Sequence, residues 1–495
     1  MSTAPMKAQK PRINRLFLWT LVATLPLAIV LLNRSAVSDV QPTPAAEPSP
    51  TPVLLAPAVE RFESLAAIEA NPTVKRRPLE IQHWNTSNGA RVYFVAAPEL
   101  PMVDLRLVFD AGSARDGDQA GLAMMTSGLI GEGTRQLDAG QISEGFEGLG
   151  AEFGASAYRD MGIVSLRSLS ASAQLQPALA LFTQVVSEPN FPEDALARTK
   201  NQAIASLEYQ QQRAGELANL RFFSDLYGDH PYATPSRGTQ ESLEAMTQAD
   251  LQGFFQRYYV ARNLVISLVG DLDRRAAEAI VEQVSLSLAS GEPAPALPEP
   301  PSLEGPIQTH IDHNSQQTQI LIGGLGVAKG DPDYAALYVG NEILGGGGFG
   351  SRLMEEVREK RGLTYGVYSH FAPMRERGPF LVSLKTRADQ TELALQVVNE
   401  TLSGFLAEGP TEQELKTAKQ NILGSFPQTT ASNSSIVGQL GSIGFYDLPL
   451  DQLEQFLSEI ESVSLEQIRA AFARHLDPQK LITLTVGQAA PEQAD

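Results

Sequence analysis

The chain has 495 residues, 43% of them hydrophobic and 19% charged, and a formal net charge of −19. This length exceeds the roughly 250–300 residues at which a single hydrophobic core stops growing, so it predicts at least two domains, and the composition excludes wholesale disorder. The acidic balance argues against nucleic acid as a partner, and the absence of cysteine excludes disulfides and thiolate-bound metals.

The first residues have the charge pattern of an exported protein. A basic segment, residues 1–15, precedes an uncharged run, residues 16–32, which as a helix would extend roughly 26 Å, near the lower limit for a transmembrane span. Positive charge before a first apolar segment favours a cytoplasmic N-terminus, so we expect a single-pass protein of the bacterial inner membrane with its body in the periplasm. The alternative is cleavage of a signal peptide at the small residues 35–38 and secretion to the periplasm, and Arg34 argues against it.

Two proline-rich stretches divide the chain. The first, residues 41–57, predicts a semi-rigid spacer, and the second, residues 291–306, predicts a linker between domains. After the anchor the chain thus divides into a lead-in, an N-terminal domain, the linker, a C-terminal domain and a tail, at residues 33–77, 78–290, 291–306, 307–488 and 489–495.

The N-terminal domain opens with a strand followed by a helix. Residues 103–109 alternate apolar and polar side chains like a half-buried strand, and residues 120–130 read as a helix. Residues 163–169 predict a second strand, followed by a long amphipathic helix. We expect that helix to bury Leu175, Leu179, Phe182 and Val186.

The C-terminal domain repeats this order. Strand-like residues 319–323 lead through a turn at 330–333 to a helix at 334–344, and a strand at 380–385 precedes a second long helix. The apolar positions of that helix are Leu393, Leu395, Val398 and Leu402. The repetition predicts an α+β protein of two similar domains, each a mainly antiparallel sheet with helices packed on one face. Coincidence is the alternative, because strand-then-helix order is common.

Several short sequence segments then indicate a family. The segments are NGARV, AGSAR, GLA, HPY with GT, NEILGGGGFGSRL and REKRGLTY, at residues 88–92, 111–115, 121–123, 230–232 with 238–239, 341–353 and 358–365. Together they resemble the pitrilysin, insulysin and mitochondrial processing peptidase family of inverzincin zinc peptidases, over residues 78–488. The resemblance implies that two halves close like a clamshell around a chamber.

The zinc site that the resemblance implies is missing. Active members carry His-x-x-Glu-His on the helix after the Gly-Leu-Ala segment, where the histidines bind zinc and the glutamate activates water. Met124, Ser127 and Gly128 occupy those positions here. The family's third ligand, a glutamate, falls near Ala205 and Ser206, with Glu208 the nearest acid. We therefore expect neither a catalytic residue nor a bound metal in this chain.

The six histidines offer no clear substitute. His310 and His313 are close in sequence, but in a strand the side chains of residues i and i+3 point to opposite faces, so a solvated strand edge is the better interpretation. His230 lies in His-Pro-Tyr, which indicates a structural turn.

Residues of the C-terminal domain still match the family's substrate-binding positions. The resemblance implies that Arg358 and Tyr365 bind the substrate backbone and help to stabilise the transition state. A surface ion pair for Arg358 and a packed strand position for Tyr365 are the alternatives. We expect Ser351 to cap the helix of Arg358, and Gly362 to end it. The loop Gly345, Gly346, Gly347 and Gly348 resembles a substrate-engaging loop, although a tight turn explains it equally well.

These observations predict the non-catalytic, substrate-binding subunit of a heterodimeric zinc metalloprotease. The expected partner is a homologous catalytic subunit that holds the zinc ion, and the expected substrate is a peptide or unfolded protein. A purely structural scaffold, resembling the core subunits of the respiratory bc1 complex, is the first alternative. A zinc metallopeptidase active by itself through an unrecognised site is the second.

Overall fold

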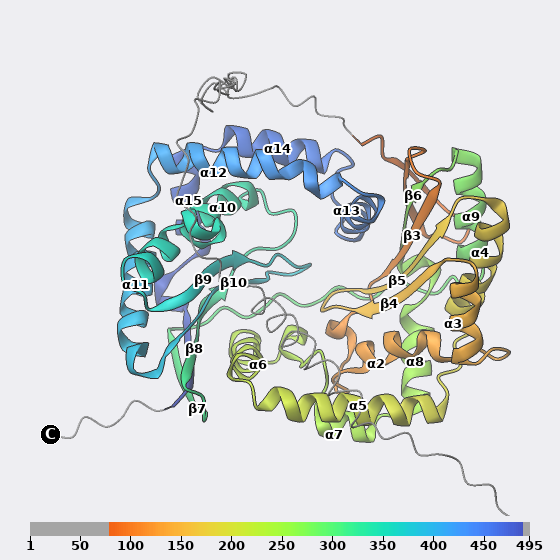
Figure 1. The fold of residues 1–495 in the computed structure, drawn as a ribbon, viewed down its shortest axis with the longest axis horizontal. Helices are drawn as coiled ribbons and strands as arrows, with labels where there is room; N and C mark the ends of the chain where they lie inside the picture. Colours follow the sequence, from red (N-terminus) through yellow and green to blue (C-terminus); the bar gives the residue numbers. More distant parts are fainter. Residues whose placement is uncertain (1–78, 489–495) are drawn as a thin grey trace, which may run out of the picture. The chain divides into compact units, whose positions relative to one another are not determined.

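The computed structural model describes residues 79–488, which form two β-sheets with helices around each (Figure 1). The predicted α+β class is confirmed. No helix among residues 79–488 is both long and apolar enough to cross a membrane. The prediction of an inner-membrane protein with a periplasmic body is corrected accordingly, since it rested on residues 16–32, which lie outside the described residues.

The first sheet has six strands in the order β1-β2-β6-β3-β5-β4, in which β2 and β6 pair in parallel and the other neighbours are antiparallel. Its strands are β1 (Gln82–Asn85), β2 (Arg91–Ala96), β3 (Met102–Phe109), β4 (Glu152–Ala157), β5 (Gly162–Leu169) and β6 (Leu264–Gly270). The predicted strands 103–109 and 163–169 are therefore confirmed as β3 and β5.

One face of the first sheet packs on helices from the same part of the chain. These are α2 (Leu122–Leu129), α3 (Ala139–Gly148), α4 (Ser172–Ser187), α5 (Glu193–Gln211), α7 (Gln240–Ala245), α8 (Gln248–Tyr258) and α9 (Arg274–Leu286). The predicted positions Leu175, Leu179, Phe182 and Val186 are all buried in this core.

The second sheet has five strands in the order β7-β11-β8-β10-β9, and only β7 and β11 are parallel. Its strands are β7 (Ile307–Asp312), β8 (Gln317–Leu325), β9 (Thr364–Phe371), β10 (Pro379–Arg387) and β11 (Ile482–Gly487). Its own helices are α10 (Tyr334–Asn341), α11 (Thr391–Glu408), α12 (Glu412–Ser425), α14 (Gln452–Ser462) and α15 (Leu465–His475). In α11 the predicted apolar position Leu393 does not face the core: it is 48% exposed, whereas Ala394 and Val397 are buried.

The other face of each sheet is covered by a helix from the part of the chain that forms the other sheet. Helix α13 (Asn433–Phe445) lies against β3 and β6 of the first sheet, on the side away from α4 and α9 (Figure 1). Helix α6 (Ala214–Tyr227) packs on β8 and β11 of the second sheet. The expectation of helices on one face only is therefore corrected, and β3 is buried on both faces rather than alternating.

Small residues let α13 lie directly on the first sheet. Gly438, Gly441 and Gly444 recur at every third position of this helix. A Cβ atom added to Gly444 would lie only 2.5 Å from the side chain of Val265 and 2.6 Å from that of Tyr93. Because interiors are close-packed, this face of α13 has no room for a methyl group at Gly444.

A buried carboxylate joins segments that are far apart in the sequence. Asp160 is 4% exposed and accepts hydrogen bonds from the hydroxyl groups of Tyr232, at 2.5 Å, and Tyr446, at 3.1 Å. The backbone N–H of Arg375, in the hairpin between β9 and β10, donates to the same carboxylate at 2.8 Å. Since a buried charge is stable only when it is well hydrogen-bonded, this junction restrains all three segments.

Candidate functional site

The degenerate zinc motif lies on α2, whose first turn is held by a buried carboxylate. Asp116 accepts hydrogen bonds from the N–H groups of Gly121, at 2.8 Å, and Ala123, at 2.7 Å. Burial raises the pKa of Asp116 to about 7, in opposition to these two donors. The local frame that starts this helix is thus well formed.

The three motif positions on α2 do not fit a zinc ion. Met124 is half-buried against the core, and the hydroxyl of Ser127 donates to the carbonyl oxygen of Met124 at 3.1 Å. Gly128 is exposed, and a Cβ atom built there would meet nothing within 4 Å. A thioether, a hydrogen-bonded hydroxyl and a bare backbone provide neither imidazole ligands nor a general base.

The position of the third ligand is equally unsuited to zinc. Ala205 and Ser206 are exposed on α5, which contacts α2, and Ser206 Oγ accepts from the side chain of Gln210 at 3.0 Å. Glu208 is also exposed on this helix. The helices that would carry the ligands are therefore adjacent, but the donor set for zinc is absent from them.

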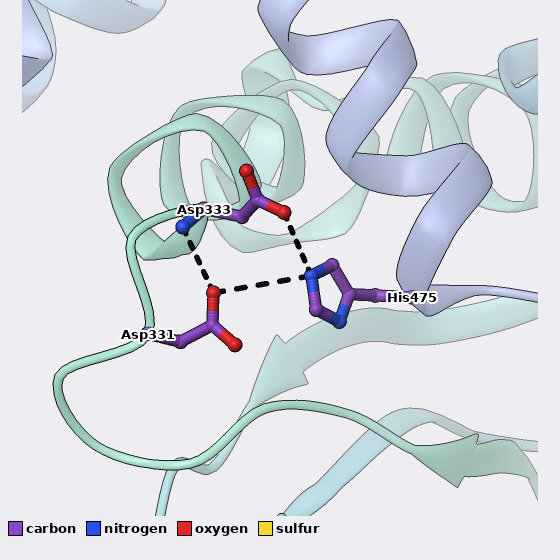
Figure 2. A group of neighbouring side chains, drawn as sticks. All are labelled: Asp331, Asp333 and His475. Carbon is purple, nitrogen blue, oxygen red and sulfur yellow. Dashed lines mark hydrogen bonds and ion pairs between the residues drawn. The ribbon is translucent and has the colours of Figure 1, made fainter.

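Within the described residues, one group offers three possible metal ligands, and it was not predicted. Asp331, Asp333 and His475 bring one ligand atom each within 4.8 Å of one another (Figure 2). His475 Nε2 lies 2.9 Å from an oxygen of Asp333, while Arg474 donates to both oxygens of that carboxylate, at 2.6 and 2.8 Å. Arg474 and His475 hold the pKa of Asp333 below its usual range. The guanidinium group of Arg474 already neutralises Asp333. The cluster of Asp331, Asp333 and His475 is therefore an ion-pair connection between α10 and α15.

Two other histidines have the structural roles that the sequence indicated. His230 Nδ1 accepts from the N–H of Tyr232 at 3.0 Å, and its Nε2 lies 2.8 Å from the carbonyl oxygen of Pro298. His310 is exposed in the edge strand β7, 2.8 Å from the hydroxyl of Thr485. Among the described residues neither belongs to a group of three potential metal ligands.

The predicted substrate-binding residues lie around two π-helical segments. Residues Glu342–Gly346 (η6) and Met354–Glu359 (η8) are π-helical. The glycine-rich stretch begins within η6, at Gly345 and Gly346, and continues toward η8. Arg358 lies in η8, and Tyr365 lies in β9, which packs against both segments. Because π-helices are rare and often mark functional sites, their occurrence on both sides of the loop is informative.

The four glycines of the loop have packing or conformational reasons to be glycine. A Cβ atom on Gly345 would lie 2.4 Å from Ser369 Oγ, and one on Gly347 would lie 2.5 Å from the carbonyl oxygen of Glu342. Gly346 is blocked by Asn341, and Gly348 has a φ of +61°. Gly345 and Gly346 belong to η6 rather than to a tight turn, so close packing at three of these positions and the positive φ of Gly348 account for the glycines without a ligand.

The ends of the helix that carries Arg358 agree with the sequence in one respect only. Gly362 has a φ of +64°, and its N–H donates to the carbonyl oxygen of Arg358 at 2.8 Å, as expected of a glycine that ends a helix. Ser351 does not cap as predicted, because its hydroxyl donates to the carbonyl oxygen of Gly348 at 2.7 Å. Ser351 therefore closes the glycine-rich loop.

The cations of residues 351–365, all of which the structure describes, differ in their partners. Arg352 makes two hydrogen bonds to Glu414, at 2.7 and 2.8 Å, and Arg361 and Lys360 bond Glu356 at 2.7 and 2.6 Å. Arg358 has only a loose contact of 3.7 Å with Glu359, and its guanidinium carbon lies 4.5 Å from the centre of the Phe349 ring. Its side chain is 31% exposed, and Tyr365 is 88% exposed. The surface ion pair that was the alternative for Arg358 is present, with Glu359, but it is long. The packed strand position that was the alternative for Tyr365 does not describe this exposed side chain.

Similarity to known proteins agrees with this arrangement. Residues 91–240 match the family described as Insulinase (Peptidase family M16), and residues 245–422 match the Peptidase M16 inactive domain. The crystal structure of a peptidase M16 inactive domain from Pseudomonas fluorescens is 49% identical, with a TM-score of 0.81 over 84% of this chain and 99% of that one. The chain belongs to the M16 peptidase family.

M16 relatives carry two kinds of name. A protein called "Non-peptidase homolog YmxG" from Helicobacter pylori is 28% identical over 396 residues, 76% of this chain and 87% of that protein. A Bacillus subtilis protein called "Uncharacterized zinc protease YmxG" is 24% identical over 402 residues, 80% and 95% of the two chains. With Met124, Ser127 and Gly128 in the motif, this M16 chain is of the non-peptidase type, as predicted.

The ion pair of Arg352 with Glu414 fixes the segment after the glycine-rich loop to α12, and the sequence did not reveal it. Arg352 holds the pKa of Glu414 at about 2, so the pair stabilises the fold above pH 5 and loses this contribution as the pH falls toward 2. We expect Glu414→Gln to lower the free energy of unfolding at pH 7 by about 1–2 kcal/mol, after allowance for partial exposure. Urea unfolding at pH 7 and pH 3 measures this difference.

The matched control is Glu278→Gln in α9, which removes an exposed pair with Arg274 and should cost less than about 0.5 kcal/mol. An equal loss in both variants at pH 7, or a loss for Glu414→Gln that is as large at pH 3 as at pH 7, would contradict the special role of Glu414.

Proposed function

We propose that this chain is the non-catalytic, substrate-binding subunit of a heterodimeric zinc peptidase. Its partner is a homologous subunit with an intact His-x-x-Glu-His motif and the catalytic zinc ion. Arg358 and Tyr365 reach the substrate backbone at the partner's active site, and this chain supplies half of the chamber. The substrate is a peptide or an unfolded protein segment.

The observation that carries this proposal is that, among the described residues, the guanidinium group of Arg358 has no close carboxylate partner. The neighbouring cations Arg352, Lys360 and Arg361 are bound to carboxylates at 2.9 Å or less, whereas the nearest carboxylate to Arg358 is 3.7 Å away. A charged donor without a close partner is available to a peptide carbonyl group, and such charge-assisted hydrogen bonds are strong.

The exposure of Tyr365 supports the same interpretation. A tyrosine that served only packing would bury its ring, but this side chain is 88% exposed at the start of β9. Its hydroxyl is therefore accessible to a developing oxyanion. The loss of zinc ligands and the retention of these two donors fit a division of labour between two subunits.

Isolation of the native complex tests the proposal. The chain, purified from its own cells without denaturation, is expected to elute on size exclusion as a 1:1 pair with a homologue that contains His-x-x-Glu-His. Mass spectrometry identifies the partner, and metal analysis should give one zinc ion per pair and none in the isolated chain. A monomer that by itself holds stoichiometric zinc and cleaves fluorescein-labelled casein in a chelator-sensitive manner would overturn it.

A further inference from the structure

Phe349 is an aromatic side chain that the core does not use. It lies in the short turn Gly348–Gly350 between the two π-helical segments, and it is 68% exposed. Its ring centre lies 4.5 Å from the guanidinium carbon of Arg358, within the range of a cation–π interaction. An exposed ring on a glycine-rich turn contributes little to folding, so this contact calls for another explanation.

The kind of partner that restrains an arginine decides which of its donors stay free. A carboxylate occupies N–H groups, as Glu414 does at the Nε and one Nη of Arg352, and as Glu356 does at Arg361. An aromatic face instead attracts the flat side of the guanidinium group and leaves the N–H groups at its rim unbonded. Phe349 can therefore orient Arg358 without using its donors.

We propose that Phe349 is a positioning residue that holds Arg358 ready for the substrate backbone. The proposal rests on the proposed function, since Arg358 must itself bind substrate. This role explains why the exposed ring lies beside Arg358, which is the one arginine of residues 351–365 without a close carboxylate.

Kinetics of the native pair, with fluorescein-labelled casein as the probe, tests this role. A cation–π contact at an exposed site corresponds to about a two- to fivefold effect, so Phe349→Leu should lower kcat by this factor and change KM less. Phe349→Trp keeps an aromatic face and should restore the rate. In Phe349→Glu the new carboxylate should hold Arg358 but occupy its N–H donors, so we expect kcat to fall about tenfold or more. The uncharged control Phe349→Gln should resemble Phe349→Leu.

A second measurement needs no partner. In the isolated full-length chain, the ring current of Phe349 should shift the Nε–Hε NMR signal of Arg358, and the shift should vanish in Phe349→Leu and persist in Phe349→Trp. Retention of the shift in Phe349→Leu would overturn the contact itself.

The outcomes separate the two proposals. If Arg358→Ala slows the pair but Phe349→Leu and Phe349→Glu do not, the positioning role is wrong and the proposed function stands. If Arg358→Ala has no effect either, the proposed function fails and the positioning role fails with it. A loss in Phe349→Leu that Phe349→Trp does not restore would point to a general disturbance of the loop and would also count against the positioning role.

Discussion

Replacement of Arg358 by alanine is expected to lower kcat of the assembled pair about 100-fold. The estimate follows from the loss of one donor that stabilises charge in the transition state, which typically costs 10²–10³ in rate. Tyr365→Phe, which removes only the hydroxyl, should have an effect of similar direction. Steady-state hydrolysis of fluorescein-labelled casein by the native pair measures both, with the amount of complex checked by size exclusion.

Arg361→Ala is the matched control for this experiment. Arg361 lies three residues further along the chain, but Glu356 binds its guanidinium group at 2.7 Å, so its donors are already used. We expect the rate of this variant to stay within about twofold of the wild type, as for other exposed ion pairs. An unchanged rate in the Arg358→Ala, Tyr365→Phe double variant would favour a purely structural subunit instead.

Gly444→Ala is expected to destabilise the protein by about 1–3 kcal/mol, the usual cost of overpacking a close-packed core. The added methyl group would lie 2.5 Å from Val265 and 2.6 Å from Tyr93, both in strands of the first sheet. These residues cannot easily move, because β6 and β2 pair with each other and β6 pairs with β3. Urea unfolding followed by far-ultraviolet circular dichroism gives the change in the free energy of unfolding.

The control is Gly404→Ala, in the middle of α11. A Cβ atom there would meet nothing within 4 Å, so alanine should be neutral or stabilise by up to about 1 kcal/mol through its better helix propensity. If Gly444→Ala behaved like Gly404→Ala, α13 would not lie as closely on the first sheet as the structure indicates.

Local patterns in the sequence were sufficient for four of the eleven strands that the structure describes and for one complete helix face. The strands at 103–109, 163–169, 319–323 and 380–385 were each found within the strands β3, β5, β8 and β10. In α4 every predicted apolar position is buried. In α11 the predicted positions Val398 and Leu402 are buried. Leu393 is not, because the small residue Ala394 faces the core in its place.

The exchange of α13 and α6, each of which covers the sheet formed by the other part of the chain, could not be predicted in the same way. Helix α13 is followed in sequence by α14 and α15, which pack on the second sheet, and its own sequence gives no sign that it packs on the first. The contact joins Val437 and Leu440 to Val108 and Val265 over more than 150 residues of chain. Periodicity reports which face of a helix is apolar but carries no information about which sheet receives it.

The sequence indicated the candidate site only through short motifs that resemble those of a known family. The spacing of Arg358 and Tyr365 drew attention to both residues, but nothing local distinguished Arg358 from Arg352 and Arg361, which carry the same charge. Their difference lies in distant partners, such as Glu414 for Arg352. Nothing in the sequence indicated a role for Phe349 except that it is aromatic and lies in a glycine-rich loop. The proposed role depends on the position of the Arg358 guanidinium group, which only the structure gives.

The exchange of helices also sets an order for biosynthesis. The apolar inner face of β2, β3 and β6 is complete as a sheet once residue 270 has been made, but its cover, α13, ends only at Phe445. At about 5–20 residues per second the ribosome needs roughly 10–35 seconds to add that stretch. Until α13 has been made, its contacts with Tyr93, Val95 and Val269 cannot form, and exposed apolar surface of this kind makes a growing polypeptide prone to aggregation.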